Sequence, residues 1–350
     1  MICFELTSFG KPLERREKQT PTPTGTEVLV RVSACGVCHS DVHLFDGYFD
    51  LGNDRTLDLS MGTSLPLTLG HEIAGEVVAF GPEVPDVVEG CRCVIYPWTG
   101  CGTCLSCVEG NEHVCRSPRS LGVKRDGGFA DHVLLPHPRY LFDYGSMATE
   151  VAATYPCSGL TALSALRKTV TKTNPGNVLI LGLGGVGFAA LSLVSAMGLT
   201  DIAAADVDNV RLDVANGRGV CNTFNPREPR ITKRIKRSTE GGFAFVVDFV
   251  GSAESASFAM SVLAPGGTLV LVGLFGGVLP VSLPLLPLKR QSIQGSYVGS
   301  LSEMNDLMAF VRAGVVPPLP VTSRPLSEVQ QALDDLRVGK IVGRLVVHPD

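Results

Sequence analysis

The sequence predicts a two-domain α/β protein in which a mainly β domain precedes a doubly wound parallel sheet. Its 350 residues exceed the length of one ordinary domain, and its 45% hydrophobic content is sufficient for two packed cores. Short β-branched runs at 27–32 and 73–80 are separated by Gly, Pro and Asp, which is typical of an irregular β domain. From about residue 159 onward, strands and helices alternate, and this alternation predicts a parallel sheet.

The alternating part is expected to form a nucleotide-binding type of sheet. Its apolar strands are expected at 178–181, 202–205, 246–248 and 268–272. A helix of small and apolar residues is expected after Gly187.

After Ser292 the pattern becomes mixed again. Helices are expected near 302–313 and 327–336, and a last strand is expected at 344–347. We assign this segment to the first domain, which is therefore discontinuous. The predicted boundaries are 1–156 with 293–350 for the first domain and 157–292 for the second.

The composition favours a small-molecule ligand. A formal net charge of −4 gives no overall positive field, so nucleic acid is not an expected partner. Residues 1–9 include Glu5 and lack a basic leader followed by a long apolar run, which predicts a cytoplasmic protein. In that compartment the eleven cysteines remain reduced and are available as metal ligands.

Two segments could be mistaken for a membrane span and a nucleic-acid-binding site. The apolar stretch 178–199 is long enough to resemble a membrane span, but four glycines interrupt its first half and favour a strand, turn and helix. The basic cluster 230–237 could suggest contact with nucleic acid. However, Ile231 and Ile235 have the spacing of an amphipathic helix whose charged face is solvated. We therefore expect neither a membrane nor a nucleic-acid partner.

Four cysteines form a short cluster with C-x2-C-x2-C-x7-C spacing: Cys101, Cys104, Cys107 and Cys115. Nearby glycines allow the tight turns that one loop needs to wrap a single ion. Four thiolates satisfy tetrahedral zinc without an open position, which indicates a structural zinc. Iron–sulfur runs have different spacing, and a zinc ribbon would have basic flanks rather than Glu109 and Glu112.

A glycine motif follows the first strand of the second domain. Gly182, Gly184 and Gly187 form G-x-G-x-x-G, with Gly185 and Val186 between them, directly after an apolar strand and before a helix. This context predicts a dinucleotide site, in which the turn approaches the pyrophosphate at a helix N-terminus. Asp206 ends the next strand, where a carboxylate accepts hydrogen bonds from ribose hydroxyls and favours NAD.

Three other residues indicate a metal site only when they are considered together. Cys38 lies in C-G-V-C-H-S-D, His71 lies in G-H-E-I-A-G-E, and Cys157 lies between a proline and Ser158. A single cysteine is more often a small buried apolar residue, and a single histidine is more often a packed, hydrogen-bonded residue.

The order of these motifs carries a resemblance. The segments 35–43 and 69–84, the four-cysteine loop and the later glycine motif occur in the order seen in zinc-containing alcohol dehydrogenases of the medium-chain dehydrogenase/reductase superfamily. The resemblance covers nearly the whole chain and is greatest to shorter microbial members. It implies a GroES-like, mainly β catalytic domain and a Rossmann cofactor domain. It also implies two zinc ions per chain and NAD.

The resemblance implies the roles of the catalytic residues. Cys38, His71 and Cys157 would bind the catalytic zinc, with Glu72 as a nearby carboxylate and occasional fourth ligand. Asp41 would orient His71 from behind, although a helix-capping carboxylate is the alternative.

The implied reaction is reversible oxidation of an alcohol to an aldehyde or ketone with hydride transfer to NAD. Ser40 and then His43 resemble the relay that carries the alcohol proton to solvent.

Further roles follow from the same resemblance. Arg211 would lie near the adenosine ribose and leaves some NADP tolerance open. His39 and Arg344 would contact the pyrophosphate, although an exposed histidine and a surface salt bridge are the alternatives. The residues at pocket positions are Trp98, Ser120, Val123 and Tyr297, which suggest an aromatic or medium-chain alcohol.

Several points are open at this stage. The polar segment 48–64 is expected near the entrance of the active site, and Cys91 with Cys93 forms an unassigned C-x-C pair. A zinc polyol or amino-alcohol dehydrogenase and a non-catalytic zinc- and nicotinamide-binding protein are alternative functions. The resemblance implies a homotetramer, with a dimer as the alternative, and the sheet edge near 284–292 is the expected interface.

Overall fold

The computed structural model describes residues 1–85, 87–170 and 176–350. Contacts divide the chain into two units. The first unit comprises Met1–Tyr48, Asp58–Leu160 and Gly299–Asp350, and the second comprises Phe49–Leu57 and Thr161–Val298. Residues 49–57 are therefore grouped with the second unit, although they lie in the chain between two segments of the first.

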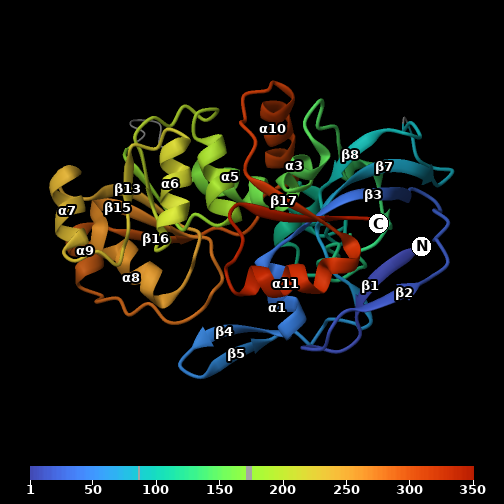
Figure 1. Ribbon diagram of the computed structural model, residues 1–350, viewed down its shortest axis with the longest axis horizontal. Coiled ribbons are helices and arrows are strands. Elements are labelled where there is room, and N and C mark those ends of the chain that lie inside the picture. Colours follow the sequence, from blue (N-terminus) through green and yellow to red (C-terminus); the bar gives the residue numbers. More distant parts are fainter. Residues whose placement is uncertain (86, 171–175) are drawn as a thin grey trace. The chain divides into compact units, whose positions relative to one another are not determined.

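The first unit is built mainly from β-strands (Figure 1). Its larger sheet has the order β10-β8-β7-β3-β18-β17, with β9 also paired to β3. The strands of this sheet are β3 (Val28–Val37), β7 (Glu72–Phe80), β8 (Arg92–Ile95), β9 (His132–Leu135), β10 (Leu141–Phe142), β17 (Val321–Pro325) and β18 (Arg344–His348). A smaller sheet contains β1 (Ile2–Leu6), β2 (Glu14–Glu17) and β6 (Leu67–Thr68). The apolar side chains of β3 and β7 are buried, as their β-branched sequences predict.

Short helices connect these strands. They are α1 (His39–Asp46), α2 (Leu105–Val108), α3 (Thr149–Ala153), α10 (Leu301–Arg312) and α11 (Val329–Arg337), with a π-helical turn at Tyr155–Gly159. The helix α1 ends at Gly47, whose φ of 84° forms a left-handed cap. The helix α4 (Leu160–Arg167) begins at the end of the first unit.

The second unit contains a six-stranded parallel sheet of order β13-β12-β11-β14-β15-β16. Its strands are β11 (Val178–Leu181), β12 (Ile202–Ala205), β13 (Asn222–Phe224), β14 (Phe243–Asp248), β15 (Leu263–Leu271) and β16 (Ser292–Gly295). The strand order reverses between β11 and β14. In such sheets ligands bind at the carboxyl ends of the strands beside this reversal.

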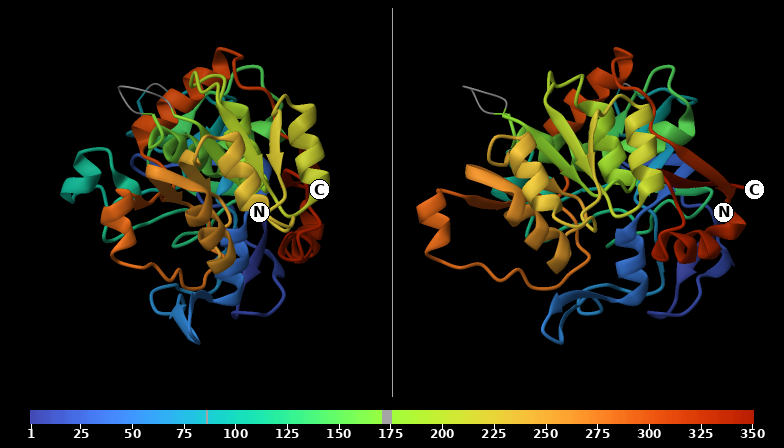
Figure 2. Two further views of the ribbon diagram at one scale, coloured as in Figure 1. Left: turned by 90° about the vertical axis from the view of Figure 1, so that its left-hand side faces the viewer. Right: turned by 60° about the vertical axis from the view of Figure 1, so that its left-hand side comes forward.

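Helices cover both faces of this sheet (Figures 1 and 2). They are α5 (Gly185–Leu193), α6 (Asn209–Gly217), α7 (Ile231–Ser238), α8 (Ala253–Val262) and α9 (Leu285–Lys289). The helices α5 and α6 lie on one face and α8 lies on the other, as right-handed crossovers in opposite directions require. Buried residues of β11, β14 and β15 form the core together with Ile231 and Ile235.

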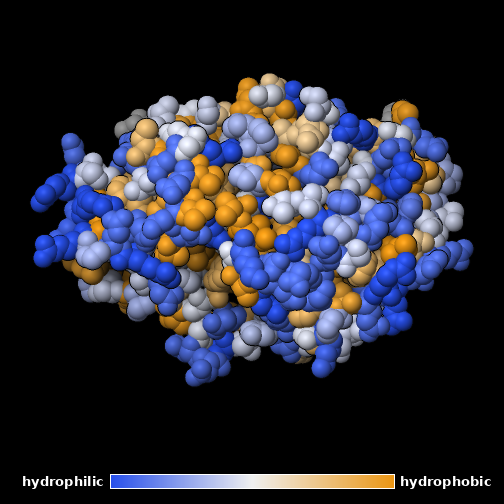
Figure 3. Space-filling view, viewed as in Figure 1, coloured by the Kyte–Doolittle hydropathy of each residue, from blue (hydrophilic) through white to orange (hydrophobic). Residues whose placement is uncertain are grey.

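The predicted elements after residue 159 are present, although β14 begins at Phe243 and β15 at Leu263, before the predicted starts at 246 and 268. The strands 178–181 and 202–205 have the predicted bounds, and the helices α10 and α11 and the strand β18 lie where they were expected. The helix α5 begins at Gly185 rather than after Gly187, because the glycines of the motif already form its first turn. In the amphipathic helix α7, Ile231 and Ile235 are buried, and hydrophilic side chains cover its outer side (Figure 3).

The polar segment 48–64 begins as a hairpin. The strands β4 (Tyr48–Gly52) and β5 (Arg55–Asp58) pair, and Asn53 and Asp54 between them have positive φ angles. A side chain at Gly52 would collide with Gly277, which explains why this hairpin is grouped with the second unit. Within the described residues, the helices are too short or too polar to cross a membrane.

Candidate metal and cofactor sites

The three scattered residues Cys38, His71 and Cys157 meet in the first unit. Cys38 lies between β3 and α1, His71 directly precedes β7, and Cys157 lies in the π-helical turn. Their side chains are buried, and their ligand atoms all lie within 4.8 Å of one another. Because β3 pairs with β7, with Gly36 opposite Glu72, the sheet itself brings the first two ligands together.

A buried carboxylate orients two parts of this site. One oxygen of Asp41 accepts a hydrogen bond from the Cys38 backbone N–H at 2.8 Å. The other oxygen lies 3.1 Å from Nδ1 of His71 and accepts from the Gly70 N–H at 3.3 Å. The helix-capping and histidine-orienting roles are therefore both filled by Asp41, which is fully buried.

Glu72 lies behind the same site. Its carboxylate forms an ion pair with Arg344, and its Oε1 accepts the Ser158 N–H at 3.2 Å. A side chain at Gly36 would collide with this carboxylate, so the glycine makes room for it. Burial raises the pKa of Glu72 although Arg344 opposes the rise. Arg344 is 4% exposed, so it is a buried ion-pair partner rather than part of a surface salt bridge.

The three ligand side chains influence each other's ionisation. A hydrogen bond with Cys157 holds the pKa of Cys38 well below its ordinary value, although burial opposes this. The same bond and burial raise the pKa of Cys157 well above its ordinary value. Burial alone would lower the pKa of His71, but the nearby Asp41 carboxylate raises it well above 6.5.

This donor set fits zinc. Two sulfurs and one imidazole nitrogen are ligands that zinc accepts, and a site with three protein ligands is the catalytic type. The Nε2 atom of His71 is buried and has no hydrogen-bond partner among the described residues. Because Nδ1 faces Asp41, Nε2 is the atom that would bind the metal.

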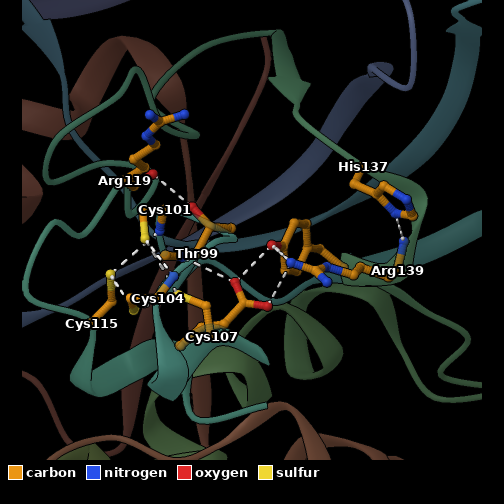
Figure 4. A network of polar contacts seen from close by, with 11 residues as sticks. Thr99, Cys101, Cys104, Cys107, Cys115, Arg119, His137 and Arg139 are labelled. Carbon is orange, nitrogen blue, oxygen red and sulfur yellow. Dashed lines mark hydrogen bonds and ion pairs between the residues drawn. The ribbon is translucent and has the colours of Figure 1, made fainter. Parts of the chain in front are cut away.

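The four-cysteine loop fits a second zinc by its distances (Figure 4). The sulfur atom of Cys104 lies 3.5 Å from the sulfur of Cys107 and 3.7 Å from the sulfur of Cys115. The sulfur atoms of Cys101 and Cys107 are 3.9 Å apart. Zn–S bonds of about 2.3 Å in a tetrahedron place the sulfurs ~3.8 Å apart. Hydrogen bonds from Thr103 and Cys104 lower the pKa of Cys101 to about 5, whereas burial raises the pKa of Cys107 to about 12.

A buried carboxylate, Glu112, holds this loop. It accepts the Gly100 N–H at 3.0 Å and the Tyr140 hydroxyl at 2.7 Å, and it pairs with Arg139 at 2.8 Å. From the sequence, Glu112 was expected only as part of a non-basic flank of the loop. A carboxylate among closely spaced zinc ligands was the signal that could have identified it.

The glycine motif of the second unit forms the expected turn. Gly182 has a φ of 89° and packs against Val250, and a side chain at Gly187 would collide with the Gly182 carbonyl. A Cβ added at Gly184 would meet nothing within 4 Å, so the backbone before α5 is open to a close ligand. A pyrophosphate fits this position, where backbone N–H groups and the helix dipole favour negative charge.

Asp206 lies beside this turn at the end of β12. Its carboxylate accepts the Leu183 N–H at 2.6 Å and the Asp208 N–H at 2.9 Å. Arg211 lies 3.8 Å from Asp206 and 3.6 Å from Asp208. Two carboxylates therefore share this cation, which lowers its availability for a 2′-phosphate.

A second buried aspartate of this unit, Asp248, was not predicted from the sequence. It ends β14, is fully buried, and accepts the Ser255 hydroxyl at 2.7 Å and the Val250 N–H at 2.9 Å. Since Val250 packs on Gly182, Asp248 supports the glycine turn. A carboxylate at the end of an apolar strand, beside the switch point of the sheet, was the available signal.

The remaining predicted residues are placed as follows. His39, Ser40 and His43 lie on α1, half-buried. Trp98 and Ser120 are buried in the first unit and Val123 is half-buried there, whereas Tyr297 is 56% exposed and belongs to the second unit. Cys91 is exposed and Cys93 is buried, and neither belongs to a metal-binding group of the described residues.

Comparisons with known proteins agree with this geometry. Residues 24–144 match the alcohol dehydrogenase GroES-like domain, and residues 185–313 match the zinc-binding dehydrogenase family. NAD-dependent alcohol dehydrogenases of Sulfurisphaera tokodaii and Saccharolobus solfataricus are each 37% identical to this chain, with 100% of both chains covered. The crystal structure of an alcohol dehydrogenase from Aeropyrum pernix matches with a TM-score of 0.89, at 28% identity and full coverage of both chains.

A β unit with a three-ligand metal site and a four-thiolate loop, joined to a doubly wound dinucleotide-binding unit, defines a zinc-dependent dehydrogenase. The full-length relatives make the assignment narrower. The chain belongs to the zinc-containing alcohol dehydrogenases of the medium-chain dehydrogenase/reductase superfamily.

Proposed function

We propose that this protein is an NAD-dependent alcohol dehydrogenase that reversibly oxidises a primary or secondary alcohol to an aldehyde or ketone. The observation that carries this proposal is the buried triad Cys38, His71 and Cys157, whose ligand atoms lie within 4.8 Å. Three protein ligands leave a coordination position for a substrate oxygen, whereas four thiolates leave none. The relatives named NAD-dependent alcohol dehydrogenases support the cofactor and the reaction.

The chain's own residues would orient the substrate and move the proton. When bound, zinc supplies a Lewis acid at the alcohol oxygen, and NAD supplies the hydride acceptor. Ser40 and His43 lie three residues apart on α1, so their side chains share one side of the helix and are proposed as the proton relay. Burial lowers the pKa of His43, so its imidazole is neutral at pH 7 and can accept a proton.

The second unit would bind the dinucleotide. The glycine turn with Gly185 and Val186 would hold the pyrophosphate at the N-terminus of α5, and Asp206 would accept the ribose hydroxyls. His39 and Arg344 are proposed as further pyrophosphate contacts. Because Arg211 is shared between Asp206 and Asp208, NAD is the proposed cofactor over NADP.

Four residues carry the proposed substrate class. Trp98, Ser120, Val123 and Tyr297 are proposed to line the pocket, which would accept an aromatic or medium-chain alcohol. Purified protein is tested with NAD and a panel of aromatic, aliphatic, polyol and amino alcohols, while the NADH absorbance band is followed. NADH formation with the aromatic or medium-chain members supports the proposal. Turnover with polyols alone would move the protein to the neighbouring enzyme class, and two bound zincs without turnover would indicate a non-catalytic protein.

We further propose a homotetramer or dimer that assembles through the edge of the second unit's sheet. The edge strand β16 is exposed, and Leu283 and Leu288 beside it are 77% and 78% exposed. Exposed edges with apolar neighbours commonly pair between subunits. Sedimentation that gives a monomer would contradict this assembly. The cytoplasm is the proposed location, because the grouped cysteines can bind zinc only when they are reduced.

A further inference from the structure

Trp98 contacts one residue of the catalytic triad and the residue directly before another. Its indole N–H donates a hydrogen bond to the Pro156 carbonyl at 3.0 Å, directly before Cys157. Its ring centroid lies 5.2 Å from that of His71, with the two planes tilted by 55°. The side chain is 4% exposed, and it is the only tryptophan of the chain.

These contacts complete the restraint of both ligands. The peptide group after Cys157 is held by Glu72 through the Ser158 N–H, and the peptide group before it is held by Trp98. The edge of the His71 ring is held by Asp41, and the indole packs against the ring from another direction. Each ligand is therefore fixed by one carboxylate and by the same tryptophan.

The backbone around Trp98 is itself fixed. The Pro97 carbonyl accepts the Leu121 N–H at 3.0 Å, and the Thr99 carbonyl accepts the Arg119 N–H at 2.8 Å. The Thr99 hydroxyl donates to the Arg119 carbonyl at 2.6 Å (Figure 4). Two backbone segments, 97–99 and 119–121, are thus paired on both sides of Trp98.

The four-cysteine loop closes the end of this pair. One residue separates the first segment from Cys101, and three residues separate Cys115 from the second segment. The sulfur atoms of Cys104 and Cys115 are 3.7 Å apart, and the Gly100 N–H is bound to Glu112. A metal in this loop would therefore tie together the two segments that hold Trp98.

We propose that Trp98 is a positioning residue that fixes His71 and Cys157, and that the four-cysteine loop keeps Trp98 in place. The loop then has a purpose beyond local stability, because it supports the ligands of the other metal site through one side chain. This inference rests on the proposed catalytic role of the triad. It assigns Trp98 a function that lining a substrate pocket does not require.

Cobalt-substituted full-length protein tests the first step. The cobalt–thiolate bands of the four-cysteine loop are recorded separately in Cys38→Ser and subtracted. Trp98→Phe removes the N–H donor but keeps a ring against His71, whereas Trp98→Leu removes both. The matched control is Tyr96→Phe, a change two residues before Trp98. It removes a 2.9 Å hydrogen bond from the Tyr96 hydroxyl to the Gly299 carbonyl.

The two Trp98 variants should form a graded series. Substitution of a residue that supports a metal ligand lowers metal affinity by about 10–100-fold. We therefore expect cobalt release to a chelator to be about 10-fold faster in Trp98→Phe and ~100-fold faster in Trp98→Leu. The triad's cobalt bands should shift in the same order. Bands and release rates equal to the unmodified protein would overturn the proposal, as would an equal change in Tyr96→Phe. If Trp98→Leu does not fold, Trp98→Phe and its control decide in the same way.

Tryptophan fluorescence tests the second step, because a single indole gives the whole signal. Cys104→Ser should shift the emission to longer wavelength, since loosening of the loop admits water to Trp98. The Cys38→Ser variant, which keeps the loop, should retain emission closer to that of the unmodified protein. Unchanged emission in folded Cys104→Ser would disconnect the loop from Trp98. Both measurements are independent of turnover, so an inactive protein with these responses would reject the proposed enzyme and retain the positioning role.

Discussion

The four-cysteine loop and the Cys38–His71–Cys157 triad both use thiolates, but the chain assembles them in opposite ways. The loop takes its four sulfurs from fifteen consecutive positions, 101–115, whereas Cys38 and Cys157 are 119 positions apart. The loop is partly exposed, and all three residues of the triad are buried. A local cluster can close around a metal by itself, while a scattered set needs a fold that places each ligand and leaves a coordination position for chemistry.

The largest expected difference between the sites concerns turnover. Cys38→Ser should lower kcat by about 10³-fold, because a catalytic metal lowers the activation barrier by several kcal/mol and each ~1.4 kcal/mol is tenfold in rate. Cys104→Ser should keep kcat within about tenfold and lower the free energy of unfolding by ~3 kcal/mol, the loop-closure value for a crosslink of this length. Steady-state kinetics and denaturant titration measure both quantities. Equal loss of turnover in the two variants would remove the division between the sites.

The second prediction concerns chemistry at the triad without loss of metal. Ser40→Ala should lower kcat by about 10²-fold, since general acid–base groups contribute 10²-fold or more. Zinc content and the unfolding temperature should remain unchanged, because Ser40 is not among the grouped metal ligands. Unchanged turnover in this variant would reject the relay.

The third prediction compares the buried carboxylates behind the two sites. Asp41→Asn should weaken zinc binding at the triad by about 10–100-fold, and Glu112→Gln should weaken binding at the loop by a similar factor. Asp41→Asn should leave zinc binding at the loop unchanged, because Asp41 binds Cys38 and His71. Glu112→Gln should weaken zinc binding at the triad much less than at the loop, because Glu112 binds Gly100 and Tyr140 and the loop reaches the triad only through Trp98. Chelator competition with each variant measures the two affinities. Losses of equal size at both sites in both variants would show that the two carboxylates do not serve separate sites.

The smallest expected effect is a pH dependence. Burial lowers the pKa of His43 below its ordinary value of 6.5. The neutral, proton-accepting form therefore persists until the pH falls below 6.5, and its contribution to stability is present above that value and lost as the pH falls through the lowered pKa. The acid limb of kcat for alcohol oxidation should lie below pH 6.5, and His43→Gln should slow turnover by about tenfold and remove the limb. An acid limb that persists in His43→Gln would assign it to another group.

The same contrast explains what the sequence could predict. The loop spacing, the glycine motif and the strands β11 and β12 are local patterns, and the structure contains them at the predicted residues. The position of Asp206 directly after a strand was predicted in the same way. These predictions needed only short-range geometry and hydrophobic periodicity.

The supporting contacts could not be predicted in this way. The hydrogen bond from Trp98 to Pro156 and the pair between Glu72 and Arg344 join distant parts of the chain, and neither partner has a local signature. The grouping of the hairpin 49–57 with the second unit depends on the close approach of Gly52 and Gly277. Such contacts arise from tertiary packing, which a residue pattern in one segment does not specify.

The most direct test of the two-site account is elemental zinc analysis of the purified full-length protein. The account predicts two zinc ions per chain in the unmodified protein and one in each of the variants Cys38→Ser and Cys104→Ser. In Cys38→Ser the remaining zinc should lie in the four-cysteine loop, and in Cys104→Ser it should lie at the triad. One zinc or none in the unmodified protein would contradict the account, because at least one of the two clusters would then not be a zinc site.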